Sequence, residues 1–258
     1  MRILVYFFVL FGFIACNQHT PNTLVIGTIA GPETDLVETA QKVAARDYNL
    51  KIKIITFNDY NLPNEALQDG SLDANVYQHL PYLETATKAH YYDFESIGRT
   101  FVYPMGIYSQ KHHSLKDLPD NSLIALPNDP SNEVRALALL AQAQLITLKA
   151  ANSTGLQAID QNPHHFKFKE MDAAQLPRIL PDVDAAVINT TFALPANLSP
   201  ARDALYTENK DSPYANIVVI RKDSPKKEQL ELFVKALNSK EVKEQAQKIF
   251  GDAAIPAW

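Results

Sequence analysis

The sequence has few of the residues that mark enzymes, metal sites and disulfide frameworks. Its one cysteine, Cys16, excludes an internal disulfide and a cysteine metal cluster. Only 8 glycines occur in 258 residues. The sequence contains no Gly-rich phosphate loop, and it lacks the Gly-x-Ser-x-Gly and His-Glu-x-x-His motifs of hydrolases and zinc proteases. We therefore expect a protein that is not an enzyme, with no catalytic residues, no cofactor and no metal.

A surplus of positive charge is also absent. The 24 lysines and arginines are outnumbered by 29 aspartates and glutamates, which gives a net charge of −5. The basic surface that nucleic-acid binding requires is not predicted. Histidine pairs at 112–113 and 164–165 lie in polar, turn-like segments. Because adjacent side chains point apart in an extended chain, neither pair is expected to share a metal.

The N-terminus carries the one long apolar run of the sequence. Residues 3–15 contain no charge, but 13 residues are too few for a membrane-spanning helix, which needs roughly 20. The run suits the apolar part of a signal peptide, predicted to cover 1–15. The order Phe13-Ile14-Ala15-Cys16 resembles a bacterial lipobox. It predicts that Cys16 is lipidated, that 16–22 form a tether, and that the protein is anchored to a membrane, facing the periplasm or the cell exterior. An ordinary signal peptide with an incidental cysteine is the alternative.

Strand-like and helix-like patterns alternate along the rest of the chain. Apolar or alternating runs predict strands, and apolar positions at helical spacing predict helices. The predicted strands are 23–29, 51–57, 72–77, 122–126, 166–170, 184–188 and 216–220, with two extended segments around 94–109. The predicted helices are 33–47, 62–68, about 79–90, 133–144, 173–180, 224–238 and 239–250. This alternation predicts an α/β fold with mostly parallel sheets covered on both faces.

One pattern occurs twice. Residues 64–79 and 176–190 each read as a short helix, a turn and an apolar-Asp-Ala-x-Val strand that ends in polar residues. Ligands of open α/β sheets lie outside the carboxyl ends of the strands. The repeat therefore predicts two related lobes whose strand ends face each other across a cleft, although chance recurrence of so short a pattern is the alternative.

The strand predicted at 216–220 follows the second copy of the pattern and suggests a discontinuous first lobe. We expect lobe 1 to combine 23–104 with 214–258, and lobe 2 to cover 105–213. The two crossings, near Tyr103-Pro104 and Ser212-Pro213, would then form a hinge.

Aromatic and amide side chains gather at the predicted strand ends and helix starts. Clusters of this kind occur at 57–60, 77–82, 101–104, 127–135, 188–191 and 212–216, and the fourth includes an arginine. An aromatic pocket with a few convergent polar groups suits a small amphipathic ligand better than a chemical reaction.

These clusters contain short motifs whose order along the chain resembles that of a known family. From about residue 24 to Trp258 the chain resembles the methionine-binding lipoproteins of the NlpA/MetQ family. The motifs are Ala30-Gly-Pro-Glu33, Phe57-Asn-Asp-Tyr60-x-Leu-Pro-Asn-Glu-Ala-Leu67, Gln78-His-x-Pro-Tyr82, Thr100-Phe-Val-Tyr-Pro104, Pro127-Asn-Asp-Pro130, Ala174-Gln-Leu-Pro-Arg178, Val187-Ile-Asn-Thr-Thr191 and Lys210-Asp-Ser-Pro-Tyr214. The resemblance implies a two-lobed periplasmic-binding-protein fold, type II-like, with the ligand cleft between the lobes. It also implies a monomer that passes L-methionine, or a related small amino acid, to an ABC permease and its ATPase.

The same resemblance implies roles for polar residues. Arg135, near the start of its helix, would bind the α-carboxylate through two parallel hydrogen bonds, and the helix N-terminus would add donors. In that role Arg135 would contribute little to the stability of the ligand-free protein. Asn189 and Asn216 would orient the amino acid from opposite sides of the hinge, with help from Asn132. Without the resemblance, Arg135 could equally be a surface arginine and Asn189 a partner for backbone groups.

Aromatic residues would surround the thioether of the ligand, where sulfur–aromatic contacts are favourable. The residues that the resemblance places there are Tyr60, Tyr77, His79, Tyr82 and Tyr103. For His79 the alternative is a helix cap, and for Tyr60 and Tyr82 it is a purely structural role in the core. Tyr77 stands where the family commonly has phenylalanine, which leaves other amino acids, a methionine dipeptide or the D-isomer open as ligands. A surface lipoprotein that acts as an adhesin is a further alternative.

Overall fold

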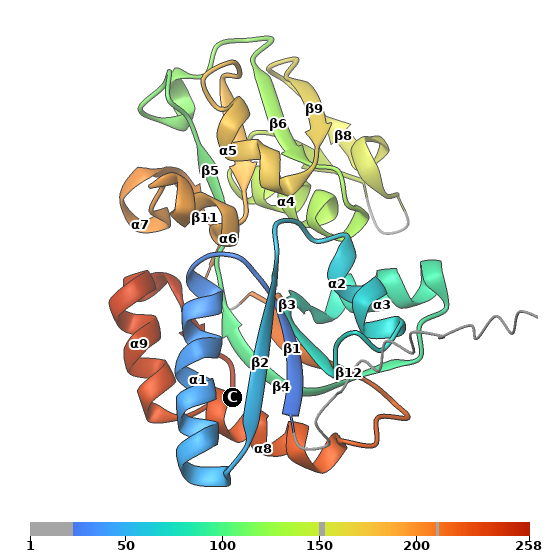
Figure 1. The fold of residues 1–258 in the computed structure, drawn as a ribbon. Helices are drawn as coiled ribbons and strands as arrows, with labels where there is room; N and C mark the ends of the chain where they lie inside the picture. The colour runs from blue at the N-terminus through green and yellow to red at the C-terminus, as the bar shows by residue number, and fades with distance from the viewer. Residues whose placement is uncertain (1–22, 150–152, 210–211) are drawn as a thin grey trace, which may run out of the picture.

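The computed structural model describes residues 23–149, 153–209 and 212–258 (Figure 1). The predicted signal peptide, Cys16 and the tether lie outside these residues. Within them, none of the helices combines the length and the apolar character needed to cross a membrane.

Two sheets form the centre of the fold, one in each lobe (Figure 1). Lobe 1 is the six-stranded sheet in the order β13-β4-β12-β3-β1-β2 with its covering helices, and lobe 2 is the five-stranded sheet in the order β11-β5-β10-β6-β9 with its own. The strands of lobe 1 are β1 (Thr23–Ile29), β2 (Lys51–Phe57), β3 (Ala74–His79), β4 (Phe94–Val102), β12 (Ala215–Arg221) and β13 (Ile255–Pro256). Those of lobe 2 are β5 (Gly106–Tyr108), β6 (Leu123–Pro127), β9 (Lys167–Met171), β10 (Ala185–Ile188) and β11 (Ala204–Thr207).

The two sheets share one topology. In lobe 1, β1 pairs in parallel with β2 and β3, and β12 is antiparallel to β3. In lobe 2, β6 pairs in parallel with β9 and β10, and β5 is antiparallel to β10. The repeated sequence pattern thus falls on corresponding strands, because β3 and β10 hold the same position in their sheets.

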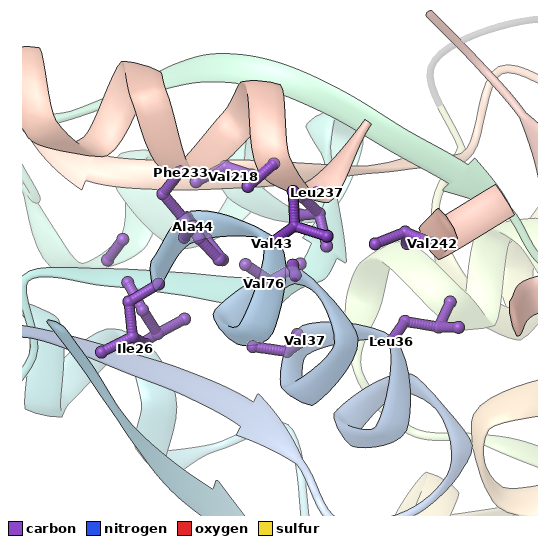
Figure 2. Close-up of a cluster of buried hydrophobic side chains, with 14 of the residues drawn as sticks. Ile26, Leu36, Val37, Val43, Ala44, Val76, Val218, Phe233, Leu237 and Val242 are labelled. Carbon is purple, nitrogen blue, oxygen red and sulfur yellow. The ribbon is translucent and has the colours of Figure 1, made fainter. Parts of the chain in front are cut away.

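Helices cover both faces of the lobe 1 sheet. On one face, α1 (Pro32–Tyr48) packs against α8 (Lys227–Leu237) and α9 (Lys240–Phe250). Figure 2 shows side chains of these helices meeting Ile26, Val76 and Val218 of the sheet. On the other face, α2 (Leu62–Gln68) and α3 (Leu80–His90) cover a smaller cluster that includes Leu67 and Leu83.

The lobe 2 sheet is also covered on both faces. Helix α4 (Pro130–Gln142) packs its leucines onto one face, against Ile124 and Val187 among others. Short helices cover the other face, where Leu176 and Leu180 are buried in the core. These helices are α5 (Leu176–Ile179), α6 (Thr190–Ala193) and α7 (Pro200–Asp203). A small hairpin of β7 (Thr147–Leu148) and β8 (Ile159–Gln161) completes the lobe.

The chain passes between the sheets twice, after β4 and after β11, and the two crossings are joined. The Met105 amide donates to the Glu208 carboxylate at 3.0 Å, and the Glu208 amide donates to the Met105 carbonyl at 3.0 Å. The Thr190 hydroxyl donates to the Pro104 carbonyl. These bonds hold the beginning of α6 beside the crossings.

Phe233 lies at the centre of the lobe 1 core and is fully buried. We expect Phe233→Ala to lower the free energy of unfolding by about 3–5 kcal/mol, because a large apolar side chain is lost and a cavity remains. Urea denaturation of the ligand-free protein measures this loss. Glu231→Ala, an exposed position of the same helix, is the control and should change stability by about 0.5 kcal/mol or less. Equal losses in the two variants would contradict this account of the core.

Candidate ligand-binding site

A cavity that is lined by residues of both lobes lies between the two sheets. Every residue predicted for the ligand site lines it. Lobe 1 and its first crossing contribute Tyr60, Tyr77, His79, Tyr82, Tyr103 and Asn216, and lobe 2 contributes Asn132, Arg135 and Asn189. The carboxyl ends of β3 and β10 both open onto this cavity, as the topology of open α/β sheets requires. Gln78, Thr190 and Thr191 also line it and were not predicted.

Three tyrosines of lobe 1 form one wall of the cavity. The ring centroids of Tyr60 and Tyr77 are 5.8 Å apart, and those of Tyr77 and Tyr82 are also 5.8 Å apart. The Tyr82 hydroxyl donates to the Tyr60 carbonyl at 3.0 Å, which fixes the ring. The ring of Phe192, from lobe 2, faces that of Tyr60 with the ring centroids 4.9 Å apart, and the sequence did not predict Phe192 as part of the site. The Tyr77 hydroxyl is buried without a hydrogen-bond partner in the described part of the chain.

Tyr103 joins this site to the core. Its ring packs against Phe250 at 4.9 Å and against Phe101 at 6.0 Å, so most of it serves the packing of lobe 1. Burial raises the pKa of the Tyr103 hydroxyl well above its ordinary value. The side chain is therefore neutral at physiological pH.

His79 both caps a helix and lines the cavity, so the two positions that the sequence suggested for it are not exclusive. As N-cap of α3 its Nδ1 accepts from the Tyr82 amide at 3.1 Å. Nε2 therefore carries the proton of the neutral ring and faces Asn132 Oδ1 at 3.5 Å. Burial and then the charge of Arg135 lower the pKa of His79 to about 3. The ring stays neutral, and both nitrogens are engaged, so His79 is not placed to act as a general base.

Arg135 makes contacts that the sequence did not predict. Its Nε and Nη2 donate to the two oxygens of Glu208 at 2.8 and 2.6 Å, and Nη2 also donates to the Tyr103 carbonyl at 2.9 Å. The Tyr214 ring stacks on the guanidinium at 4.5 Å. Arg135 is 4% exposed, so it is not a surface arginine. One edge of the guanidinium is thus used inside the protein, and Nη1 is the nitrogen left for a ligand among the described contacts.

The ion pair changes the expected role of Arg135 in stability. The Arg135 and Glu208 side chains are only 4% and 7% exposed. Removing one member of a buried pair leaves the other charge uncompensated and is strongly destabilising. Arg135 therefore holds the ligand-free protein together as well, which differs from the sequence prediction that it contributes little there.

A chain of hydrogen bonds orients the amides of lobe 2. Asp129, the N-cap of α4, accepts from the Asn132 amide at 2.9 Å and from Asn132 Nδ2 at 3.1 Å. Asn132 Oδ1 then accepts from Asn189 Nδ2 at 2.8 Å. The side-chain oxygen of Asn189, Oδ1, is left buried without a partner among the described residues. Asn189 therefore presents an acceptor, and Asn132 supports it from behind.

Lobe 1 orients Asn216 in the same way. Asn216 Nδ2 donates to Glu33 Oε1 at 2.9 Å and to the Tyr77 carbonyl at 3.2 Å, so both of its hydrogens are used. Glu33 is 4% exposed, and its other oxygen is buried without a partner in the described residues. Burial raises the pKa of the Glu33 carboxyl to about 7, against the opposite effect of the Asn216 hydrogen bond.

Sequence reasoning missed three residues that support this site: Glu33, Glu208 and Tyr214. Glu33 reads as an ordinary acid in the first turn of a helix, where it complements the helix dipole. Glu208 stands in a polar segment without periodicity. Glu33 and Tyr214 each end a family motif, but the resemblance implies no role for either. Apart from those motifs, none of the three carries a local signal that separates it from a surface residue.

The sequence and the fold of this chain match those of known proteins. The model of the NlpA lipoprotein family matches residues 24–258. The D-methionine-binding lipoprotein MetQ of Salmonella typhi is 46% identical over 246 residues, which cover 94% of this chain and 91% of that protein. An ABC transporter periplasmic substrate-binding protein from Coxiella burnetii has a TM-score of 0.88 at 55% identity, covering 91% of this chain and 100% of that chain. A nutrient-binding protein from Burkholderia cenocepacia, solved with bound methionine, has a TM-score of 0.88 at 47% identity, with 91% and 100% coverage. As the ordered motifs predicted, the chain belongs to the NlpA lipoprotein family and has the two-lobed α/β fold of periplasmic substrate-binding proteins.

Proposed function

We propose that the protein binds methionine in the cavity between its lobes and delivers it to an ABC importer. The observation that carries this proposal is the polarity of the cavity. Its lining combines a guanidinium and two side-chain amides with a group of three tyrosines. A free amino acid with an apolar side chain has the matching distribution of charge. The names of the relatives from Salmonella and Burkholderia support the same ligand.

The groups of methionine fit the cavity one by one. The carboxylate would bind Arg135 Nη1, because a charge-assisted hydrogen bond is strongest to an ionised acceptor. The ammonium would donate to the side-chain oxygen of Asn189, which has no partner among the described residues, and to that of Asn216, whose two amide hydrogens are already used. The thioether would lie among Tyr60, Tyr77 and Tyr82, where each sulfur–aromatic contact contributes roughly 0.3–1.5 kcal/mol.

Ligand binding would close a hinge between two lobes, with 23–104 and 214–258 in lobe 1 and 105–213 in lobe 2. The lobes contact each other around the cavity. Asn61 Nδ2 donates to Asp172 at 3.2 Å, and the Tyr60 and Phe192 rings are 4.9 Å apart. A ligand that contacts both lobes at once shifts the equilibrium toward this closed arrangement. We propose that the ABC permease recognises the closed form.

The remaining parts of the proposal concern the setting of the protein. Lipidation of Cys16 would hold a monomer at the membrane, facing the periplasm or the cell exterior. The tether of 16–22 would let the two lobes reach the permease, and the ATPase would act on the far side of the membrane. Membership of a lipoprotein family supports the anchor. Binding without catalysis accords with a site whose histidine has both nitrogens engaged.

One observation favours a more polar ligand as the second candidate. Tyr77 lines the cavity, and its buried hydroxyl has no hydrogen-bond partner among the described residues. Another amino acid with a polar end, or a methionine dipeptide, would offer that hydroxyl an acceptor. The D-isomer of methionine would place the same groups in a different order around the amides.

Native mass spectrometry of freshly purified protein, followed by calorimetry with a panel of ligands, tests the proposal. We expect a retained mass equal to that of methionine and a stronger response to L-methionine than to other amino acids, D-methionine or methionine dipeptides. Tighter binding of an amino acid without sulfur would refute methionine as the ligand.

Variants of Arg135 and Glu208 distinguish an effect on ligand binding from an effect on the stability of the fold. We expect Arg135→Ala to lower the free energy of unfolding by about 3–5 kcal/mol, because Glu208 is left as an unpaired buried charge. The double variant R135A/E208Q should recover most of this loss, since the unpaired charge is gone. Both variants should bind methionine at least about 100-fold more weakly, because the carboxylate loses its charged partner. Urea denaturation and calorimetry measure the two effects. Near-normal affinity in the double variant would mean that Arg135 acts only in the fold.

Tyr77→Phe distinguishes methionine from the more polar ligands. Removing a buried hydroxyl without a partner should raise the free energy of unfolding by about 1 kcal/mol and leave methionine affinity within about threefold. A loss of tenfold or more in the affinity for the retained ligand would show that the hydroxyl bonds to it. Tyr82→Phe is the matched control, because its hydroxyl does have a partner.

A further inference from the structure

Glu33 is a buried acid that lies directly behind the wall of the ligand cavity. It is the second residue of α1 and is 4% exposed, but it does not line the cavity itself. Its Oε1 accepts from Asn216, and its Oε2 is buried without a partner among the described residues. The fold leaves this carboxyl incompletely satisfied, although a buried polar group normally has all its partners.

Ionised Glu33 costs the ligand-free protein stability. Its pKa is raised to about 7 by burial, above the ordinary value of 4.5. The folded state therefore binds the proton more tightly than the unfolded state between these values. By linkage, this carboxyl makes the folded protein less stable as the pH rises from about 4.5 to about 7. A glutamine of the same shape would avoid the cost and keep an acceptor for Asn216.

The hydrogen bonds indicate what the charge does. A carboxylate can only accept, so Asn216 must turn its Nδ2 toward Glu33 and its oxygen away. The Tyr77 carbonyl takes the second hydrogen of Nδ2 and holds the same orientation. Asn216 lines the cavity, and because both of its amide hydrogens are used, its oxygen would be the atom that it offers to a ligand. A negative charge behind that amide makes its oxygen a stronger acceptor for a cation.

We propose that Glu33 is a positioning residue whose carboxylate, acting through Asn216, makes the cavity select ligands that carry a free α-ammonium group. The inference rests on the proposed amino-acid ligand and adds the residue that recognises one end of it. An ammonium group a few ångströms beyond Asn216 would favour ionised Glu33, so the charge is stabilised when the ligand is bound. The negative charge that destabilises the ligand-free protein would therefore strengthen the binding of a cationic group.

Among the described residues, no unpaired cation of the protein competes for the charge of Glu33. The hydroxyls of Tyr60 and Tyr103 are near enough for the charge of Glu33 to raise their pKa values further, and both stay neutral. His79 is neutral, because burial lowers its pKa to about 3. Arg135 is paired with Glu208. On the lobe 2 side, Asp129 is buried and hydrogen-bonded to Asn132.

A pair of ligands and a pair of variants test the proposal. The ligands are methionine and its des-amino analogue, 4-(methylthio)butanoate, which has no ammonium group. The variants are Glu33→Gln and, as matched control, Glu133→Gln. Glu133 also lies in the first turn of a helix, α4, and its pKa is raised to about 7. One of its oxygens is buried without a partner among the described residues, but Glu133 does not line the cavity. Affinities are measured by calorimetry at pH 8, where Glu33 is mostly ionised.

We expect Glu33→Gln to weaken methionine binding about 10-fold to 100-fold, the size expected for a charge pair at this separation in a protein. Binding of the des-amino analogue should change by less than about threefold, because no ammonium is present to feel the charge. Glu133→Gln should leave both affinities unchanged. Equal weakening of both ligands by Glu33→Gln, or no effect on either, overturns the proposal. If the analogue binds too weakly to measure, the pH profile below decides.

The pH dependence of binding gives a readout that a purely structural role would not move. In the wild-type protein, methionine affinity should fall as the pH drops from 8 to 5.5, by up to tenfold per pH unit below about 7, because Glu33 becomes protonated. In Glu33→Gln the profile should be flat over this range. The variant should also melt higher than wild type when ligand-free at pH 8. A variant that keeps the wild-type profile, or that melts lower at every pH, contradicts the proposal.

The outcomes also separate this inference from the proposed function. If the wild-type protein binds another amino acid instead of methionine, the same experiment with that amino acid and its des-amino analogue applies, and only the assignment of methionine fails. If the protein binds methionine but Glu33→Gln keeps the wild-type preference for the ammonium group, only the role of Glu33 fails.

Discussion

The Arg135–Glu208 ion pair is the interaction on which the geometry of the site depends. It joins α4 of lobe 2 to the second crossing, and Arg135 also donates to the carbonyl of Tyr103 in the first crossing. The backbone and side chain of Glu208 bond to Met105, which completes the connection. A guanidinium that is to meet a ligand in a dry cavity must be held without losing its charge-assisted hydrogen bonds. The protein achieves this by bonding one edge of Arg135 to the two crossings and leaving Nη1 unused among the described contacts.

The orientation of the two asparagines of the cavity is likewise fixed by hydrogen bonds to groups behind them. An amide can present either a donor or an acceptor, and the group behind it decides which. Asp129 acts on Asn189 through Asn132, and Glu33 acts on Asn216 directly, so an acid in each lobe takes up the N–H groups. In the proposed site, one side-chain oxygen from each lobe would then be left for the ligand. Because each lobe supplies one, a cationic group between them would be bound completely only when the lobes are together.

Much of the fold could be predicted from the sequence, because the signal is local. The helix at 33–47 and the strand at 51–57 were placed within one residue of α1 and β2, since their apolar spacing matches the period of a helix or a strand. The strand at 204–207 and the short helix at 190–193 were missed, because four residues do not establish a period. The residues that line the cavity were predicted through family motifs rather than through spacing, and the role of Phe192 beside Tyr60 was not anticipated.

The sequence by itself determined the α/β class, the two related halves, the family and most of the residues that line the cavity. These follow from periodicity, from a repeated strand pattern and from motifs of neighbouring residues. Only the tertiary structure decided what each polar group does, because Glu33 and Asn216 are 183 positions apart and Arg135 and Glu208 are 73 apart. Burial and partners set the charge and the direction of a polar side chain. Both are created when distant segments meet, so no local pattern in the sequence records them.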